Sequence, residues 1–233
     1  MEHQHSILYG PFNWVWHKLG FAWDVPDHVV MALLVFAICA VLLPLVSRSF
    51  SRDDPGHFQQ FLEYIIGGLR NLLEDVVGHG SERYLDLIGA LTVFIFISNI
   101  FGLFFFLQPP TANVNTTFGL AICAFLYYNF HGIRAQGPLH YLKHFGGPVW
   151  WLAPLMFPIE LIGHFARILS LGVRLFGNIF GEHTATGIFV GLMPFVIPWP
   201  MMGLGIFGAV LQTFIFVMLT MVYIGGAVAT EEH

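Results

Sequence analysis

The sequence predicts an all-α integral membrane protein, and three observations support that class. Of its 233 residues, 56% are hydrophobic and only 10% are charged, whereas a soluble domain is about 25% charged. The apolar run VVMALLVFAICAVLLPLVS at 29–47 has close to the ~20 residues that a helix needs to cross the hydrocarbon core. The mean hydropathy of the chain, +0.72, agrees with this class.

An amphipathic helix is expected directly after this first span, within residues 48–83. Apolar residues recur there every three or four positions, with Gln, Glu, Arg and Asp on the other face, which is typical of a helix lying flat at a membrane surface. We therefore expect 48–83 to be cytoplasmic or interfacial. Its apolar positions are Phe58, Phe61, Leu62, Ile65, Ile66, Leu69, Leu72, Leu73, Val76 and Val77.

Further apolar runs predict the remaining membrane helices, within residues 84–233. A second span is expected at 84–108, and the run at 117–130 is short for a third unless it borrows residues from the loop predicted at 131–147. Residues 148–192 stay apolar for 45 residues, more than one perpendicular crossing needs. The last span is expected at 199–228. Together these runs predict one membrane domain over residues 1–233.

The distribution of lysine and arginine orients the chain. Six basic residues fall in 48–83 and 131–147, against Lys18 alone on the other side, which places residues 1–28 outside as an external N-terminal segment. These 28 residues have no basic region followed by a short apolar core, so we do not expect a cleavable signal peptide. The C-terminus is cytoplasmic if 148–192 crosses the membrane once and external if it crosses twice, because that segment's ends carry no basic residue.

Polar residues form a stripe along one face of a helix over 148–192. At about 100° per residue, residues spaced by seven or four positions share a sector, and His183 points to roughly the opposite side. The stripe consists of Glu160, His164, Arg167, Arg174, Asn178 and Glu182. A charged residue at the bilayer centre costs at least about 2.5–3.5 kcal/mol, so this face must meet a partner or a water-filled cavity.

The two arginines of the stripe differ in their prospects for pairing. Arg167 is seven residues from Glu160, and a purely structural ion pair is as good an interpretation as a functional one. Arg174 is 14 residues from Glu160 and eight from Glu182, about 21 and 12 Å along a straight helix, too far for direct pairing. Arg174 therefore suggests an anion that comes from elsewhere in the chain or from another protein.

The sequence gives little support for a metal site, an enzymatic centre or a voltage sensor. The chain has no HExxH, no GxSxG and no P-loop motif, so we expect no metal, no cofactor and no enzymatic centre. The histidine pair His140 and His144 falls in a charged loop. Cys39 and Cys123 lie in apolar runs and are best interpreted as packed free thiols. A voltage sensor would need more basic residues at shorter intervals than the stripe offers.

Four segments resemble one known family. LSLGVRLFGNIFGEH at 169–183 is similar to the signature segment of subunit a of the rotary F-type, proton-translocating ATP synthases. LQTFIFVMLTMVYIGGAVATEEH at 211–233 is similar to that family's last helix. PTANVNTTFGLAI and LIGALTVFIFISNIFGL match its middle spans. The resemblance covers roughly residues 30–233 in one consistent order.

The resemblance implies a non-catalytic stator subunit. Its arginine, matching Arg174, would face a rotating ring of small proteolipid subunits, each with one membrane-buried carboxylate. Two offset half-channels would deliver and remove protons beside the arginine and so couple proton flow to rotation. A peripheral stalk subunit and the lipid bilayer are the other expected partners, and nucleic acid is not expected. The location implied is the inner membrane of a bacterium, with the N-terminus outside and the C-terminus cytoplasmic.

The same resemblance assigns roles to individual residues. Asn178 and Gln212 match polar residues near the arginine and the proton uptake path, and Asn115 matches a polar position at its external end. Glu160 matches an acidic residue of the other half-channel, and we include His164 beside it. His183 matches a position that relays protons in relatives.

The chain departs from the family at one site position. Relatives often carry an ionisable residue seven positions before the glutamine, and that position here is Gly205. Glu182, next to His183, is our candidate for the missing relay partner.

The resemblance also implies that 148–192 is one long, strongly tilted helix with the last span as its antiparallel partner, which makes about five membrane helices. Two rival functions remain open. A stand-alone channel or transporter would transport by itself, whereas a stator would co-purify with a proteolipid ring. An intramembrane enzyme is the second rival and lacks a recognisable motif.

Overall fold

The structure is a computed structural model, and it describes residues 6, 8–18, 23–48, 50, 56–78, 80–104, 107–137, 153–192 and 198–228. The prediction of an all-α membrane protein is confirmed, since these residues form helices and no strand. The long helices are α2 (Asp27–Arg48), α3 (His57–Val77), α4 (Leu85–Phe101), α5 (Val114–Gln136), α7 (Ala153–Leu192) and α8 (Pro198–Val228). Shorter ones are α1 (Tyr9–Lys18) and the 3₁₀ turns η1 (Ser81–Tyr84) and η2 (Pro110–Ala112).

Four helices in the described part of the chain are long and apolar enough to cross a membrane: α2, η1 with α4, α7 and α8. Helix α5 is less apolar, but its 23 residues span about 34 Å, slightly more than the hydrocarbon core of roughly 30 Å. Five membrane helices therefore agree with the fold. The histidine pair expected at 140 and 144, and the C-terminal residues 229–233, lie outside the described residues.

The N-terminal segment contains a helix that the sequence did not predict, α1, and is tied to the start of α2. Asn13 donates from Nδ2 to the carbonyl of Val25 (3.2 Å) and accepts from its backbone N–H (2.8 Å). Ser6 donates from its backbone N–H and from its hydroxyl to the carboxylate of Asp27, at 2.8 and 2.6 Å. These bonds hold the segment against the first turn of the first span.

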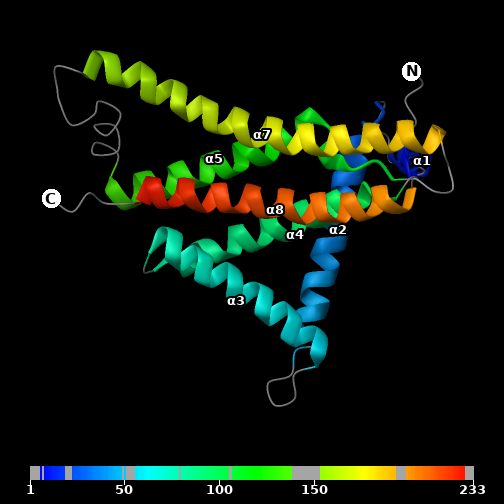
Figure 1. Cartoon of the computed structure of the whole chain (residues 1–233), viewed down its shortest axis with the longest axis horizontal. Coiled ribbons are helices and arrows are strands. Elements are labelled where there is room, and N and C mark those ends of the chain that lie inside the picture. Colours follow the sequence, from blue (N-terminus) through cyan, green and yellow to red (C-terminus); the bar gives the residue numbers. More distant parts are fainter. Residues whose placement is uncertain are drawn as a thin grey trace.

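Helix α3 forms where its periodicity predicts a helix, and the later part of its apolar face packs on the bundle. Leu73 is fully buried there, whereas Phe58 and Phe61, apolar positions nearer the start of the helix, are exposed. The helix ends at Gly78, whose φ of +93° lies in a region that favours glycine. In Figure 1, α3 lies beside α4 at the lower edge of the bundle. Its position flat on a membrane surface remains a prediction.

Helix α5 is longer than the sequence suggested, and the loop expected from residue 131 was wrong for its first six residues. The helix begins early because Asn113 caps it, its Oδ1 accepting from the backbone N–H of Asn115 at 2.9 Å. It continues because tertiary contacts hold its last turn: Gln136 donates to the carbonyl of Ala227 in α8 at 3.2 Å. Gly137, with φ of +82°, follows the last turn.

Helices α7 and α8 confirm the long antiparallel pair. Residues 153–192 form one helix of 40 residues, about 60 Å long, so the described part of the apolar segment is one continuous helix and not a pair of helices. Figure 1 shows α7 and α8 running in opposite directions, and α2 running steeply across them. No single membrane normal can be parallel to both α2 and α7. A helix twice as long as the hydrocarbon core is thick must be strongly inclined.

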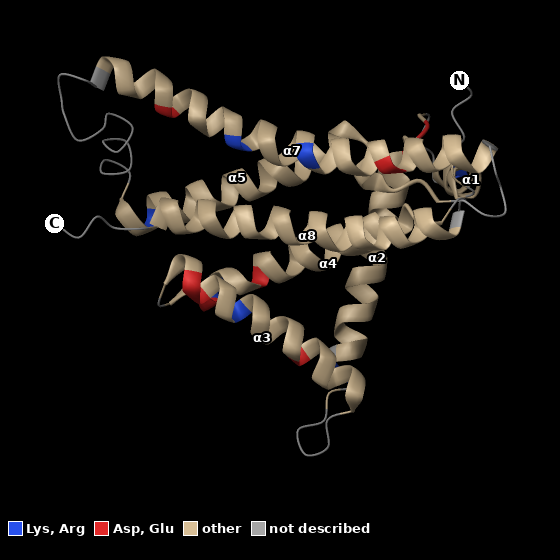
Figure 2. Ribbon diagram, viewed as in Figure 1, with Lys and Arg blue, Asp and Glu red and all other residues tan. Residues whose placement is uncertain are grey.

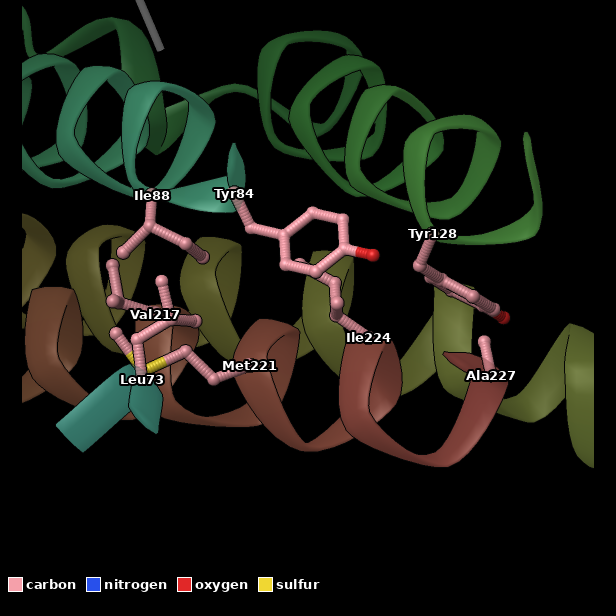
Figure 3. Packing of buried hydrophobic residues seen from close by; sticks show 8 residues of the cluster. All are labelled: Leu73, Tyr84, Ile88, Tyr128, Val217, Met221, Ile224 and Ala227. Carbon is pink, nitrogen blue, oxygen red and sulfur yellow. The ribbon is translucent and has the colours of Figure 1, made fainter. Parts of the chain in front are cut away.

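Two apolar clusters hold the bundle together, and α8 contributes to both. The first, shown in Figure 3, joins α3, η1, α4, α5 and α8. It consists of Leu73, Tyr84, Ile88, Tyr128, Val217, Met221, Ile224 and Ala227. The second joins α4, α5, α7 and α8 and consists of Leu91, Ile95, Ala121, Ala124, Leu171, Leu175, Ile179 and Phe216. One side of α7 is thus fixed to the bundle while its other side stays open.

Candidate functional site

Of the two long helices, α7 carries charged residues and α8 carries none. Figure 2 shows acidic and basic residues following one another along α7, whereas α8 carries none. In order along the helix they are Glu160, Arg167, Arg174 and Glu182. The site therefore consists of a charged helix beside an uncharged one that offers amide, hydroxyl and glycine positions.

Arg174 lies at the centre of this arrangement and points away from the core. Its neighbours Leu171 and Leu175 are buried in the second cluster, whereas Arg174 itself is exposed. The guanidinium donates to the hydroxyl of Ser170 at 3.3 Å. No carboxylate of the described residues pairs with it. The structure thus leaves a permanent positive charge on the open face of a membrane helix.

Asn178, one turn further along α7, connects this face to α8. Its Nδ2 donates to Oε1 of Gln212 at 2.5 Å. Gln212 is 2% exposed, and its Nε2 has no hydrogen-bond partner among the described residues. A buried donor without a partner costs about 1–3 kcal/mol, so a role other than stability is expected for this glutamine.

A second group of polar residues lies on the first half of α7. Glu160 Oε1 is 3.7 Å from Arg167 Nη2 and 3.6 Å from His164 Nδ1. The guanidinium of Arg167 also lies over the ring of Tyr223 on α8, with Cζ 5.5 Å from the ring centroid. The structural ion pair of Glu160 and Arg167 is therefore formed, and Arg167, unlike Arg174, has a carboxylate partner in its own helix.

Two aromatic rings of α5, those of Phe125 and Tyr128, lie against the ring of His164, which is 7% exposed. The ring of Tyr128 lies 6.3 Å from the His164 ring and 5.9 Å from that of Tyr223, centroid to centroid. The hydroxyl of Tyr128 is buried and has no hydrogen-bond partner among the described residues. Tyr128 was not selected from the sequence, because nothing in an apolar run distinguishes a tyrosine that faces a polar cluster from one that fills a core.

Glu182 and His183 lie toward the other end of α7, and both are partly buried. The carboxylate of Glu182 contacts α8 at Gly205 and Gly208, because a Cβ built at either glycine would fall within 3 Å of one of its oxygens. The sequence singled out Glu182 as a substitute for an ionisable side chain at position 205. The structure brings Glu182 to that position across the helix interface.

Asn115 is not joined to this site. It is exposed at the start of α5, where its backbone N–H donates to the cap residue Asn113, and its side chain forms no hydrogen bond with the described residues. A buried polar group near the same end of the bundle was missed: Thr111 donates to Oδ1 of Asn99 at 2.8 Å. Asn99 Nδ2 and the hydroxyl of Ser98 have no partner among the described residues. The pair Ser-Asn inside an otherwise apolar span was the signal available in the sequence.

The polar groups of the site are arranged in series along α7. Titratable groups form two separate sets on α7, and an unpaired arginine and an amide pair lie between them. Among the described residues, no group of three or more His, Cys, Asp or Glu side chains could hold a metal ion. The fold and the site define a multi-pass membrane protein whose longest helix presents a fixed cation on an open face.

Comparison with known proteins identifies the family. The family model described as ATP synthase A chain matches residues 29–225. A protein of Geobacter sulfurreducens named ATP synthase subunit a is 44% identical over 207 residues, 89% of each chain. One of Geotalea uraniireducens with the same name is 42% identical, again over 89% of each. ATP synthase subunit a 2 of Syntrophotalea carbinolica is 41% identical over the full length of both. The chain belongs to the ATP synthase A chain family.

Proposed function

We propose that this chain is the proton-translocating stator subunit of an F-type ATP synthase. The observation that carries the proposal is Arg174, an exposed arginine on a membrane helix with no carboxylate partner among the described residues. A permanent cation facing lipid would be unfavourable, so it needs an anion from another molecule. A ring of small proteolipid subunits, each with one buried carboxylate, supplies that anion in turn.

The chemistry at the arginine follows from charge and solvation. A ring carboxyl group in lipid is stable when protonated, because burial penalises its charged form. Opposite the guanidinium of Arg174 the ionised form is favoured, and arginine cannot itself give up a proton. Each ring carboxyl therefore releases its proton as it reaches Arg174 and takes up another after it passes. Each proton that crosses supplies about 2.3 kcal/mol per 100 mV.

Two half-channels on opposite sides of Arg174 deliver and remove the protons. The external one uses Asn115, then Glu182 and His183, and reaches the ring beside Asn178 and Gln212. Support for the inner part of this path is the contact of Glu182 with α8 and the hydrogen bond between Asn178 and Gln212.

The cytoplasmic half-channel uses Glu160 and His164, with Oε1 of the glutamate 3.6 Å from Nδ1 of the histidine. Arg167 balances the charge of Glu160 there and is not part of the path.

The subunit itself is non-catalytic: the rotation it permits drives a soluble head that makes ATP. Besides the ring and the bilayer, a peripheral stalk subunit is its expected partner, holding it against the rotating ring. The excess of basic residues at 48–83 and 131–147 supports an external N-terminus and a cytoplasmic C-terminus in a bacterial inner membrane. Residues 1–233 would form one membrane domain.

The test compares the two arginines of α7 in membrane vesicles that contain the whole complex. Arg174→Ala is expected to abolish ATP-driven proton pumping, whereas Arg167→Ala, whose side chain pairs with Glu160, should keep most of it. The amount of the chain that co-purifies with the ring shows that both variants assemble. Normal pumping by Arg174→Ala would refute the proposed function.

A further inference from the structure

Two glycines of α8, Gly205 and Gly208, stand three residues apart on the face that meets α7. A Cβ at Gly205 would lie 2.4 Å from Glu182 Oε1, and one at Gly208 would lie 2.8 Å from Glu182 Oε2. Real Cβ atoms do not approach other heavy atoms this closely, since contact begins near 3.5 Å. Each glycine therefore makes room for one oxygen of the same carboxylate.

We call Gly205, Gly208 and the space in front of them the notch. The notch determines the position of the Glu182 carboxylate through packing and not through hydrogen bonds or ion pairs. Among the described residues the carboxylate accepts no hydrogen bond and forms no ion pair. In contrast, Glu160 on the same helix is held by His164 and Arg167. Because the carboxylate has no polar partner among these residues, its position depends on the space that the two glycines leave for it.

A methyl group in the notch would move the carboxylate rather than the helices. The atoms it meets at Gly208 belong to the flexible end of one side chain, and no backbone atom comes within 4 Å. At Gly205 the Cδ2 atom of Leu103 is also 2.4 Å away, so a change there disturbs the core as well. Gly208 is therefore the more selective probe. Gly203, on the same helix with nothing within 4 Å, is the matched control.

We propose that Gly205 and Gly208 are positioning residues that hold the Glu182 carboxylate in the interface of α7 and α8. Their role is to let a carboxylate carried by α7 occupy a place that a side chain of α8 would otherwise fill. The proposal rests on the proposed function, because the position of Glu182 matters only if protons pass through it. In oriented reactions a displacement of about 1 Å can cost roughly 100-fold in rate.

The experiment measures ATP-driven proton pumping in vesicles containing the whole complex, normalised to the amount of chain that co-purifies with the ring. Gly208→Ala is expected to lower the initial rate at least about tenfold, Glu182→Gly to lower it as much, and Gly203→Ala to leave it unchanged. Combining Glu182→Gly with Gly208→Ala should cause no further loss, because both changes act on one carboxylate.

A reciprocal exchange separates positioning from a structural effect. With Glu182→Gly making space, Gly208→Glu places a carboxylate in the notch from the other helix and should restore pumping, whereas Gly208→Gln should not. A wild-type rate for Gly208→Ala or for Glu182→Gly would overturn the proposal. An equal loss of pumping rate in Gly203→Ala would also overturn it. So would a double variant Glu182→Gly, Gly208→Ala in which the two single losses of rate multiply.

Arg174→Ala in the same vesicles separates the two proposals. If it pumps normally, the proposed function fails. If it does not pump while Gly208→Ala does, only the positioning role of the glycines fails.

Discussion

A single methyl group at Gly225 should loosen the contact between α3 and α8. A Cβ there would lie 2.9 Å from the carbonyl oxygen of Val76 and 3.6 Å from Cα of Val77. These are backbone atoms in the last turn of α3, so they cannot move aside as a flexible side chain would. Restoring ordinary contact near 3.5 Å requires that turn to shift by about half an ångström.

The expected cost follows from this shift. Overfilling a packed interface typically costs about 1–3 kcal/mol, and we expect the lower half of that range because Gly78, directly after α3, lets the end of the helix yield. For a chain of this size 1 kcal/mol corresponds to roughly 2–4 °C in melting temperature. Gly225→Ala should therefore lower the midpoint of thermal unfolding of the detergent-purified complex by several degrees.

The next residue supplies the control. Gly226 has nothing within 4 Å of its Cβ position, and alanine in place of an exposed helical glycine stabilises by about 0.4–1 kcal/mol. Gly226→Ala should thus melt no lower than the wild type. The assay is the fraction of complex that stays monodisperse in size-exclusion chromatography after heating. Equal midpoints for the two variants would refute the argument from the Val76 carbonyl.

Three further predictions concern other contacts. Arg167→Gln should lower stability by only about 0.5–1 kcal/mol, because its ion pair with Glu160 is partly exposed. A loss of more than about 3 kcal/mol in the same heating assay would contradict this. Gln212→Leu removes a buried amide whose Nε2 donor already lacks an acceptor among the described residues, so stability should change by less than about 1 kcal/mol while pumping falls sharply. Parallel loss of stability and pumping would show that the hydrogen bond from Asn178 is structural. Asn13→Leu removes two buried hydrogen bonds to the backbone of Val25 and should destabilise the N-terminal segment by about 2 kcal/mol. The measurement is the rate of protease cleavage before α2, which should rise in Asn13→Leu and rise less in Asn13→Asp.

The membrane helices could be predicted because their signal is local. An apolar run of sufficient length, as in α2, has few alternatives in any protein. The three-four spacing around Leu73 likewise specifies an amphipathic helix without reference to the rest of the chain. The end of α5 was missed because Gln136 continues the helix through a bond to α8, 91 residues away in sequence. No local pattern carries that information.

The candidate site was predictable where helical geometry alone places residues together. Arg174 and Asn178 share a face by their spacing, and their exposure agrees with it. Contacts with residues on another helix could not be predicted in this way. Residue spacing does not specify that Gly208 faces Glu182, or that Tyr128 contacts His164, because both depend on how two helices are rotated against each other. The resemblance to a family supplied Gln212, which periodicity did not reveal.

One consequence follows from the order of residues along α7. Between His164 and Glu182 this helix contains no group that can gain or lose a proton near neutral pH, since arginine, serine and asparagine do not titrate there. Helix α8 contains none either. Over about 27 Å between His164 and Glu182, the helix pair thus offers no group on which a proton could rest. Under the proposed function, a proton that passes from one end to the other must therefore leave these helices and return to them, carried across the gap by the ring.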